Sequence, residues 1–307
     1  MILLYGIPGD GPLELIADTL EAKGMDFFLV NPRQFKLLDF IFFYDGKHFG
    51  GEISIGADSY PLDKITGIYN RGFDFELVPE AKDLFETDTF SMYQKMFNLF
   101  NQWIEVSEAR VINRASAMAS NASKPYQLSL IKSFFKIPDS LVTNSIRSLN
   151  SFREKYREII YKSSSSIRSV VKSIEHGDTG MDFHSIRNCA TLFQERLVGT
   201  NYRVHVIDKK LFAIKAEAET VDYRYSSREG KETILEEIKL PASISKKCLA
   251  LANALGLAFA GIDLFLTDNS EWYCFEVNPS PGFSYFENNT GVPIADAVVE
   301  YLAGVKS

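Results

Sequence analysis

The chain has 307 residues, of which 46% are hydrophobic and 24% are charged, and its formal net charge is −7. This is the composition of a globular protein that is too long for one typical domain, so we expect two or three packed subdomains. The negative charge argues against broad nucleic-acid binding. The 3 cysteines form no CxxC pair, which indicates neither a zinc site nor a disulfide framework. Without a signal peptide or a long apolar run, the sequence predicts a cytoplasmic protein with no membrane contact.

The first part of the chain predicts an α/β unit. Ile2–Tyr5 reads as a buried strand, a helix follows it, and residues 26–30 form a second strand, which is the opening of a small parallel sheet. The glycines do not spell GxGxxG, so no dinucleotide site is predicted. After a hairpin over 40–55, the strand Gly67–Asn70 leads into Arg71, which either faces a ligand cleft or is a solvated surface arginine. A helical pattern over 79–103 predicts one long core helix.

The middle of the chain combines small polar segments with short strands. A helix is expected from about Pro125, and residues 158–162 read as a strand that ends in Lys162. A run of serines follows, and residues 168–174 read as the returning strand. The serine run is either a flexible turn or a loop whose N–H groups and hydroxyls bind phosphate oxygens.

Three basic residues fall on the next hairpin and the loop after it. Arg203 and Lys215 lie on the two strands of a hairpin over 201–217, and Arg224 lies in the polar loop 221–230. Each of them could be an ordinary exposed cation. Together they would form a basic wall opposite the acidic hairpin that closes the chain.

The closing hairpin carries three polar groups in an apolar ribbon. Its strands run over 258–267 and 271–277, separated by the turn residues Asp268-Asn269-Ser270. Glu276 and Asn278 are two apart and project to one side, and Asp263 falls roughly opposite Glu276. Two carboxylates and an amide oxygen are a hard-oxygen site for Mg²⁺. The alternative is an edge hairpin with solvated acids.

The order of these signals resembles the ATP-grasp ligases, and within them the RimK-like branch. GIDLFL…CFEVNPSPGF is similar to the second magnesium motif of that family. NRASAMASNASKPYQLSLI and EIIYKSSSS resemble the segments that carry the two nucleotide lysines, and FQERLVGTNYRVHVI resembles the hinge that reads adenine. The resemblance covers roughly residues 110–307. The phosphate loop is serine-rich here, where the family usually has glycines.

The resemblance implies an α/β (α+β) ATP-grasp fold in which the nucleotide is held between two β-sheets. It implies an N-terminal domain over 1–112, a central subdomain over 113–193 and a C-terminal subdomain over 194–307. The implied site residues are Lys124, Lys162 and Ser164 for the phosphates, Gln194, Glu195 and Leu197 for adenine and ribose, Asp263, Glu276 and Asn278 for two Mg²⁺ ions (or Mn²⁺), and Arg203, Lys215 and Arg224 for the transferred phosphoryl group.

The implied chemistry is that of a ligase: ATP and a carboxylate give an acyl phosphate, which an amine or a hydroxyl attacks. The Tyr69-Asn70-Arg71 segment resembles the branch that crosslinks ribosomally made peptides, which favours a peptide substrate. A leader peptide would then dock on 145–156 or 176–188, unless both are plain surface. The alternatives are a ligase that adds an amino acid to a small metabolite or a protein tail, and a non-catalytic nucleotide-binding protein. A homodimer is also left open.

Overall fold

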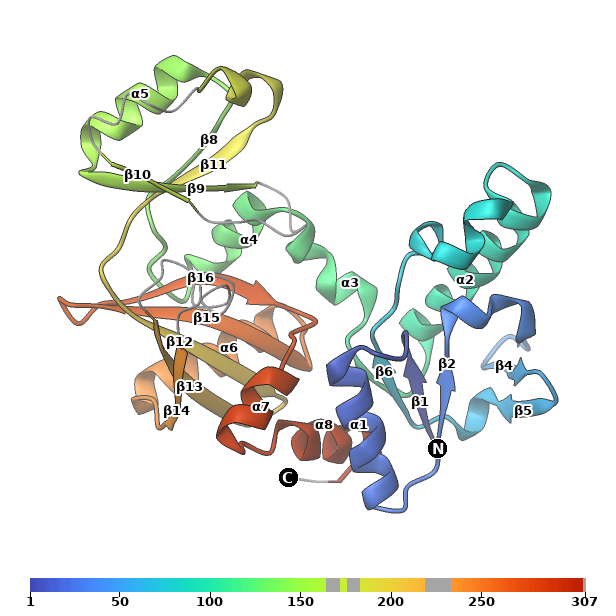
Figure 1. Cartoon of the computed structure of the whole chain (residues 1–307). Coiled ribbons are helices and arrows are strands. Elements are labelled where there is room, and N and C mark those ends of the chain that lie inside the picture. The colour runs from blue at the N-terminus through green and yellow to red at the C-terminus, as the bar shows by residue number, and fades with distance from the viewer. Residues whose placement is uncertain (164–171, 176–182, 219–232, 306–307) are drawn as a thin grey trace.

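The computed structural model describes residues 1–163, 172–175, 183–218 and 233–305. These residues form four β-sheets, two of them in the N-terminal part, one in the middle of the chain and one near its end. The central sheet lies above the C-terminal sheet, and the N-terminal part lies beside both (Figure 1).

A parallel sheet forms the centre of the N-terminal part, as the sequence predicts. Its strand order is β2-β1-β6-β7, and all three pairings are parallel. The strands are β1 (Ile2–Tyr5), β2 (Phe27–Val30), β6 (Gly67–Asn70) and β7 (Arg110–Ile112). Helix α1 (Gly11–Ala22) connects β1 to β2 and has a proline in its first turn, where the missing N–H costs nothing.

The two faces of this sheet pack against different helices because alternate side chains of a strand point to opposite sides. Ile2 and Leu4 face α1 and α8 (Ile294–Ala303), the last helix of the chain. Leu3 and Tyr5 face α2 (Asp88–Val106) and its aromatic side chains. The chain thus begins and ends in one hydrophobic core, with α1 and α8 side by side (Figure 1).

The helix predicted over 79–103 is interrupted, which corrects the single long helix. A 3-10 helix, η4 (Pro79–Leu84), comes first, and α2 begins only at Asp88. Between them Glu86 has φ of 62°, a left-handed conformation that no α-helix contains. Thr87 then caps α2 by accepting a hydrogen bond from the N–H of Phe90. The aromatic residues do have helical spacing, but this spacing continues across Thr87 and therefore does not reveal where α2 begins.

The remaining elements of the N-terminal part are short. The predicted hairpin is confirmed as β3 (Leu38–Tyr44) and β4 (Phe49–Ile55), to which β5 (Asp58–Pro61) adds a third strand. Three-residue to six-residue 3-10 helices complete this part: η1 (Pro32–Leu37), η2 (Leu62–Lys64) and η3 (Phe75–Leu77). The connection to the central sheet is helical: α3 (Ala115–Met118), η5 (Ala119–Ala122) and α4 (Lys124–Ile131).

The central sheet is antiparallel, with the order β10-β9-β11-β8. Its strands are β8 (Ser140–Thr143), β9 (Glu158–Ser163), β10 (Lys172–Glu175) and β11 (Thr191–Glu195), and its helices are α5 (Ile146–Lys155) and the 3-10 helix η6 (Phe183–Asn188). Ile159 and Phe193 pack with Leu149 of α5 on one face. The predicted strand over 168–174 lies partly outside the described residues, and its last part falls in β10.

The C-terminal sheet is antiparallel, with the order β14-β13-β12-β15-β16. Its strands are β12 (Gly199–Ile207), β13 (Lys210–Ala218), β14 (Thr233–Ile238), β15 (Phe259–Thr267) and β16 (Trp272–Asn278). Val204 and Leu264 face helix α6 (Ala242–Ala254), and Ile207 and Phe259 face α8. A short helix, α7 (Ser284–Thr290), follows β16. Both predicted hairpins are confirmed.

None of the helices in the described ranges is both long enough and apolar enough to cross a membrane.

One buried amide connects the N-terminal part to the C-terminal sheet. Asn113 is 2% exposed, and its Nδ2 donates to the carbonyls of Phe259 and Pro279, both at 2.6 Å. Its Oδ1 accepts from the N–H groups of Ala258 and Phe259 at 2.9 and 3.1 Å. Replacing Asn113 would leave these backbone groups buried without partners, which costs roughly 1–3 kcal/mol for each unsatisfied group.

We therefore expect Asn113→Ala to destabilise the protein by at least about 3 kcal/mol. Thermal unfolding monitored by circular dichroism should show a midpoint several degrees below that of the wild type. The matched control is Asn150→Ala, because Asn150 is exposed in the middle of α5 and a surface change of this kind costs less than about 0.5 kcal/mol. Equal midpoints for the two variants would show that Asn113 does not hold the two parts together.

Candidate active site

The acidic hairpin has the register that the sequence predicts. Asp263 of β15 pairs with Glu276 of β16, and Gly261 pairs with Asn278. Side chains of paired residues in an antiparallel ladder lie on the same face, about 4.5–5.5 Å apart at Cβ. The register shifts only after Asp263, so the bulge leaves this stretch intact. Both carboxylates and the Asn278 amide therefore project from one face of the C-terminal sheet.

Arg203 lies on the next strand and on the same face. Its backbone pairs with Asp263, and its Nη1 lies 2.6 Å from Asp263 Oδ1. The two side chains are only 5% and 13% exposed, so this ion pair is shielded from water. Gly261 makes room for the guanidinium, because a Cβ at Gly261 would lie 2.2 Å from Arg203 Nη2. The Phe286 ring covers the guanidinium, with 5.8 Å from Cζ to the ring centroid.

His205 completes the surroundings of Arg203. It is fully buried, and its Nε2 accepts a hydrogen bond from Arg203 Nε at 3.4 Å. Burial, and secondarily the charge of Arg203, hold the pKa of His205 well below its usual value, so the ring is neutral. A neutral acceptor leaves the positive charge of the site on Arg203.

The donor set fits a divalent cation. Asp263 and Glu276 are like charges in directly opposed positions, which is unfavourable unless a cation lies between or beside them. Arg203 compensates Asp263, while Glu276 forms no ion pair with any described residue. Asn278 Oδ1 accepts one hydrogen bond, from Ser280 N–H at 2.9 Å, and its second lone pair is left for a metal. Within the described residues no cluster of three His, Cys, Asp or Glu exists, so the third ligand would be this amide.

The two predicted phosphate lysines are both buried, at 8% exposed for Lys124 and 9% for Lys162. Lys124 is the first residue of α4, which Ser123 caps and which contacts β16. Lys162 pairs with Leu192 in the central sheet, so it lies on the face opposite Phe193 and α5. That face looks toward the C-terminal sheet (Figure 1). Ser164, the third predicted phosphate residue, lies outside the described residues.

The predicted hinge residues connect the central and C-terminal sheets at the end of β11. Gln194 is 1% exposed, and its Nε2 donates to Ser140 Oγ at 2.9 Å. Glu195 Oε1 accepts from the N–H of Asp139 at 2.8 Å, so this carboxylate holds the start of β8. It lines an open groove of about 420 Å³ together with Tyr273. Leu197 follows, half-buried, before β12.

Lys215 does not join Arg203, which alters the predicted basic wall. Lys215 pairs with Tyr202, the neighbour of Arg203, and therefore projects from the opposite face of the sheet. There it forms an ion pair with Glu217. The prediction counted positions from a three-residue turn over 208–210, which would place Lys215 opposite Arg203. The turn has only two residues, so Arg203 pairs with Ile214 and Lys215 with Tyr202. Arg224 lies outside the described residues.

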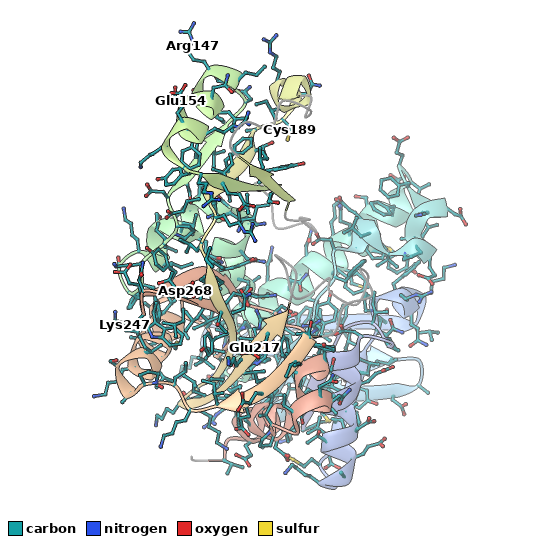
Figure 2. All side chains as sticks on the ribbon, turned by 60° about the vertical axis from the view of Figure 1, so that its left-hand side comes forward. Arg147, Glu154, Cys189, Glu217, Lys247 and Asp268 are labelled. Atoms are coloured by element: carbon teal, nitrogen blue, oxygen red, sulfur yellow. The ribbon has the colours of Figure 1, made fainter. Side chains whose placement is uncertain are left out.

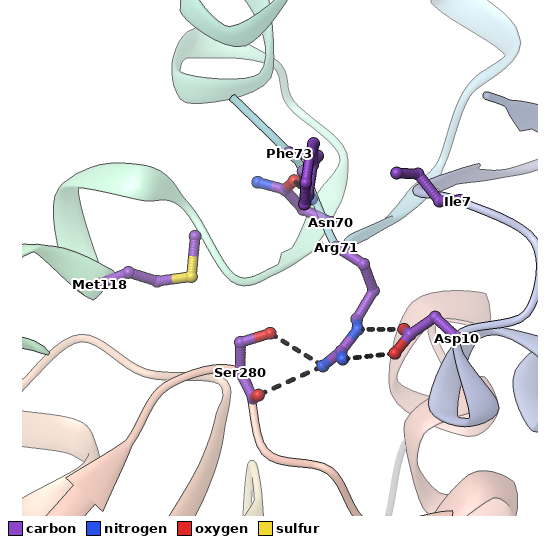
Figure 3. Close-up of a pocket in the computed structure, with 8 residues that line it drawn as sticks. Ile7, Asp10, Asn70, Arg71, Phe73, Met118 and Ser280 are labelled. Carbon is purple, nitrogen blue, oxygen red and sulfur yellow. Dashed lines mark hydrogen bonds and ion pairs between the residues drawn. The ribbon is translucent and has the colours of Figure 1, made fainter. Parts of the chain in front are cut away.

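A cavity of about 390 Å³ opens between the N-terminal part and the loop 279–282 that follows Asn278 (Figure 3). Its polar lining includes Asp10, Asn70, Arg71 and Ser280, and Ile7, Phe73 and Met118 form apolar walls. The Arg71 side chain is only 16% exposed. Of the two interpretations of Arg71, the structure supports the one in which it faces a cleft.

Sequence reasoning did not single out Asp10, Asn113, His205, Gly261 or Ser280. The first two are ordinary turn and loop residues by local pattern. A glycine inside a strand is a weak sign that another group approaches the backbone closely, so of these residues only Gly261 gave a signal in the sequence.

Comparison with known proteins places the chain in a family. The family model for the RimK-like ATP-grasp domain matches residues 120–302, well over half of the chain. The protein is a member of the RimK-like ATP-grasp family.

Solved structures show the same fold over the whole chain. An ATP-grasp ligase from Chryseobacterium gregarium, described as RiPP-associated and in complex with ADP and a leader and core peptide, superposes with a TM-score of 0.84 at 17% identity and covers 100% of this chain and 97% of its own. The macrocyclase MdnC from Microcystis aeruginosa, bound with precursor peptide MdnA, gives 0.81 at 19% identity over 99% and 100%. PsnB, complexed with minimal precursor, Mg and ADP, gives 0.77 at 21% over 98% of both. The fold is therefore the ATP-grasp fold.

Curated relatives match over shorter stretches. The "Probable alpha-L-glutamate ligase" of Trichodesmium erythraeum is 29% identical over 134 residues, or 43% of each chain. The "Probable alpha-L-glutamate ligase 2" of Shewanella amazonensis is 31% identical over 108 residues, or 35% of each chain. The matches thus span less than half of these relatives.

We expect Glu276→Gln to abolish stabilisation by Mg²⁺ with ADP while leaving the fold intact, because Glu276 holds no described partner in place. In the wild type, ligand at a hundred times its Kd should stabilise by about 2.7 kcal/mol, which a thermal shift measures. Asp268→Asn, in the exposed turn of the same hairpin (Figure 2), is the control and should shift like the wild type. An undiminished shift in Glu276→Gln would contradict the metal site.

Proposed function

We propose that this protein is an ATP-dependent ligase that activates a carboxylate as an acyl phosphate for attack by an amine or a hydroxyl. The observation that carries the proposal is the alignment of Arg203, Asp263 and Glu276 on adjacent positions of three neighbouring strands. Phosphoryl transfer needs positioning and charge neutralisation more than covalent catalysis. A shielded arginine beside two carboxylates that can hold a metal supplies both.

The nucleotide would bind between the central and C-terminal sheets. Lys124 and Lys162 would contact its phosphates, together with Ser164, which follows β9 in the sequence. Because the side chains of Gln194 and Glu195 are already bonded to the start of β8, the base would be read mainly by the hinge backbone near Leu197. We propose the subdomain limits 1–112, 113–193 and 194–307 on this basis, although β11 itself continues to Glu195.

Asp263, Glu276 and Asn278 would hold the Mg²⁺ ions, for which two ions, or Mn²⁺ in their place, are consistent with hard-oxygen ligands. Bound there, Mg²⁺ would neutralise charge on the phosphates and align them for transfer. Arg203 would then be released from part of its contact with Asp263 and would stabilise the transferred phosphoryl group. Lys215 has no place in this proposal, since it projects from the other face of the sheet.

A peptide is the substrate that we propose. The supporting observations are the whole-chain likeness to ligases described with precursor, leader or core peptides and the cavity beside the Asn278 loop. At about 390 Å³ the cavity can hold an amino-acid side chain rather than a whole peptide. A leader peptide would dock on the central subdomain, where α5 presents the exposed charges of Arg147 and Glu154 (Figure 2).

A second candidate is the addition of an amino acid, such as glutamate, to a small molecule or a protein tail. The names of the curated relatives favour it. A non-catalytic nucleotide-binding protein is disfavoured, because Arg203 compensates only Asp263 and the opposed Glu276 carboxylate is the kind of group that a bound cation would compensate.

We expect ADP release that depends on both Mg²⁺ and an acceptor peptide with Asp or Glu and Ser, Thr or Lys side chains. Each crosslink removes one water from the peptide, whereas amino-acid addition increases the mass, so mass spectrometry separates the two candidates. Arg203→Lys should lower kcat by at least about tenfold, since a lysine cannot contact both Asp263 and the phosphoryl group in the same way. Arg33→Lys is the control, because Arg33 forms an exposed ion pair with Glu80 in the N-terminal part.

ADP release that needs no acceptor, or that is unchanged in Glu276→Gln, would overturn the ligase proposal. Mass gain with amino acids and no water loss from any peptide would overturn the peptide substrate alone.

A further inference from the structure

Arg71 connects the N-terminal part to the loop that carries the last metal ligand. Its Nε and Nη2 donate to the two carboxylate oxygens of Asp10, at 2.6 and 2.9 Å. Its Nη1 donates to Ser280 Oγ at 2.9 Å and to the carbonyls of Ser280 and Pro281 at 3.2 and 3.4 Å. Figure 3 shows the guanidinium between Asp10 and Ser280. Both ends of the fork are used, so this arginine is a connector.

The Asp10 carboxylate binds Arg71 instead of capping helix α1. It occupies the N-cap position of α1, where an aspartate normally accepts a hydrogen bond from the first turn of the helix. Here the Asp10 side chain makes no such bond and gives both oxygens to Arg71. A bidentate carboxylate–arginine pair with Arg71 only 16% exposed is among the stronger polar contacts in proteins.

Ser280, which Arg71 holds in place, in turn orients the side chain of Asn278. The backbone N–H of Ser280 donates to Asn278 Oδ1 at 2.9 Å, which orients the amide that would bind metal. β16 ends at Asn278, so no sheet pairing holds the following residues. Pro279 is held from the other side by Asn113, whose Nδ2 donates to its carbonyl at 2.6 Å. The loop 279–282 is therefore fixed by one contact to Asn113 and by the contacts to Arg71.

We infer that Arg71, braced by Asp10, is a positioning residue for the metal site. It holds Ser280, and through Ser280 the Asn278 amide, in the orientation that Mg²⁺ with nucleotide requires. This inference rests on the proposed function in one respect, namely that the bound ligand is Mg²⁺ with a nucleotide. The contacts of Arg71 are to Asp10, Ser280 and Pro281, and not to the proposed metal ligands. Because Asp10 neutralises its charge, Arg71 has no role in binding a substrate carboxylate in this inference.

The geometry also indicates why arginine is needed. The planar fork contacts a carboxylate with one edge and carbonyl and hydroxyl oxygens with the other, and a lysine ammonium cannot reach both. Arg71→Lys should therefore behave like a loss of the connection, and Arg71→Gln should do so more strongly.

The chain offers a matched control. Arg110 also connects the N-terminal part to the C-terminal part, since its Nη1 donates to the carbonyl of Tyr301 at 3.1 Å. This contact is made to helix α8 and not to the loop 279–282. Arg110→Gln removes one arginine contact between the same two parts. Any effect on stability alone should be shared by Arg71→Gln and Arg110→Gln.

Two measurements test the inference on the full chain. Hydrogen exchange followed by mass spectrometry should show at least about tenfold faster exchange of the amides of Ser280, Gly282 and Phe283 in Arg71→Gln, with β15 and β16 unchanged. A Mg²⁺ titration of fluorescent ADP binding should show the apparent Mg²⁺ affinity reduced about tenfold. Arg110→Gln should match the wild type in both.

Unchanged loop exchange in Arg71→Gln, or a Mg²⁺ dependence equal to that of Arg110→Gln, would overturn the positioning role. If the wild type bound no nucleotide with Mg²⁺, the proposed function would fail, and the exchange measurement would still decide whether Arg71 restrains the loop. Asp10→Asn, which weakens the brace without altering Arg71, should reproduce part of both effects.

Discussion

The site depends on three charged side chains that neighbouring strands bring side by side. Arg203, Asp263 and Glu276 occupy paired positions on β12, β15 and β16, so the sheet itself forces two carboxylates together. Opposed like charges are unfavourable in a ladder, and Arg203 offsets only one of them. Within the described residues this leaves a local excess of negative charge at Glu276, which a bound cation would compensate. Gly261 and the neutral His205 maintain it, the first by leaving space for the guanidinium and the second by adding no charge.

The rest of the fold fixes the loop 279–282, which follows the strand that carries Glu276 and Asn278. Asn113, just after β7, satisfies backbone groups on both sides of the site, at the start of β15 and beyond the end of β16. α8 returns to pack on α1, so the N-terminal sheet and the C-terminal sheet share one core. Rigid connection is useful here because ligands for a small cation must be held within a narrow range of positions.

Structure could be predicted from the sequence where neighbouring residues determine an element or where residue spacing determines the register of a hairpin. The alternating apolar residues and the turn at Asp268 define the closing hairpin, and its register follows from them. The predicted wall of basic residues failed at Lys215 because a shift of one position exchanges the faces of a strand. The break at Glu86 was missed because aromatic periodicity continues across it. Asp10, Arg71 and Ser280 could not be grouped, since 61 and 209 residues separate Arg71 from its partners.

The origin of the cavity walls bears on how such a ligase would select its acceptor. The shared RimK-like domain covers residues 120–302. This range contains the lysines, the hinge residues and the metal ligands that we propose. Of the residues that line the cavity, all but Ser280 lie before residue 120. The proposed chemistry would therefore reside in the shared domain, while the shape and polarity of a pocket for the acceptor would come mainly from residues before position 120. Arg71 lines that pocket and also restrains the loop 279–282. Substitutions near Arg71 that alter the choice of acceptor would therefore also alter the affinity for the metal.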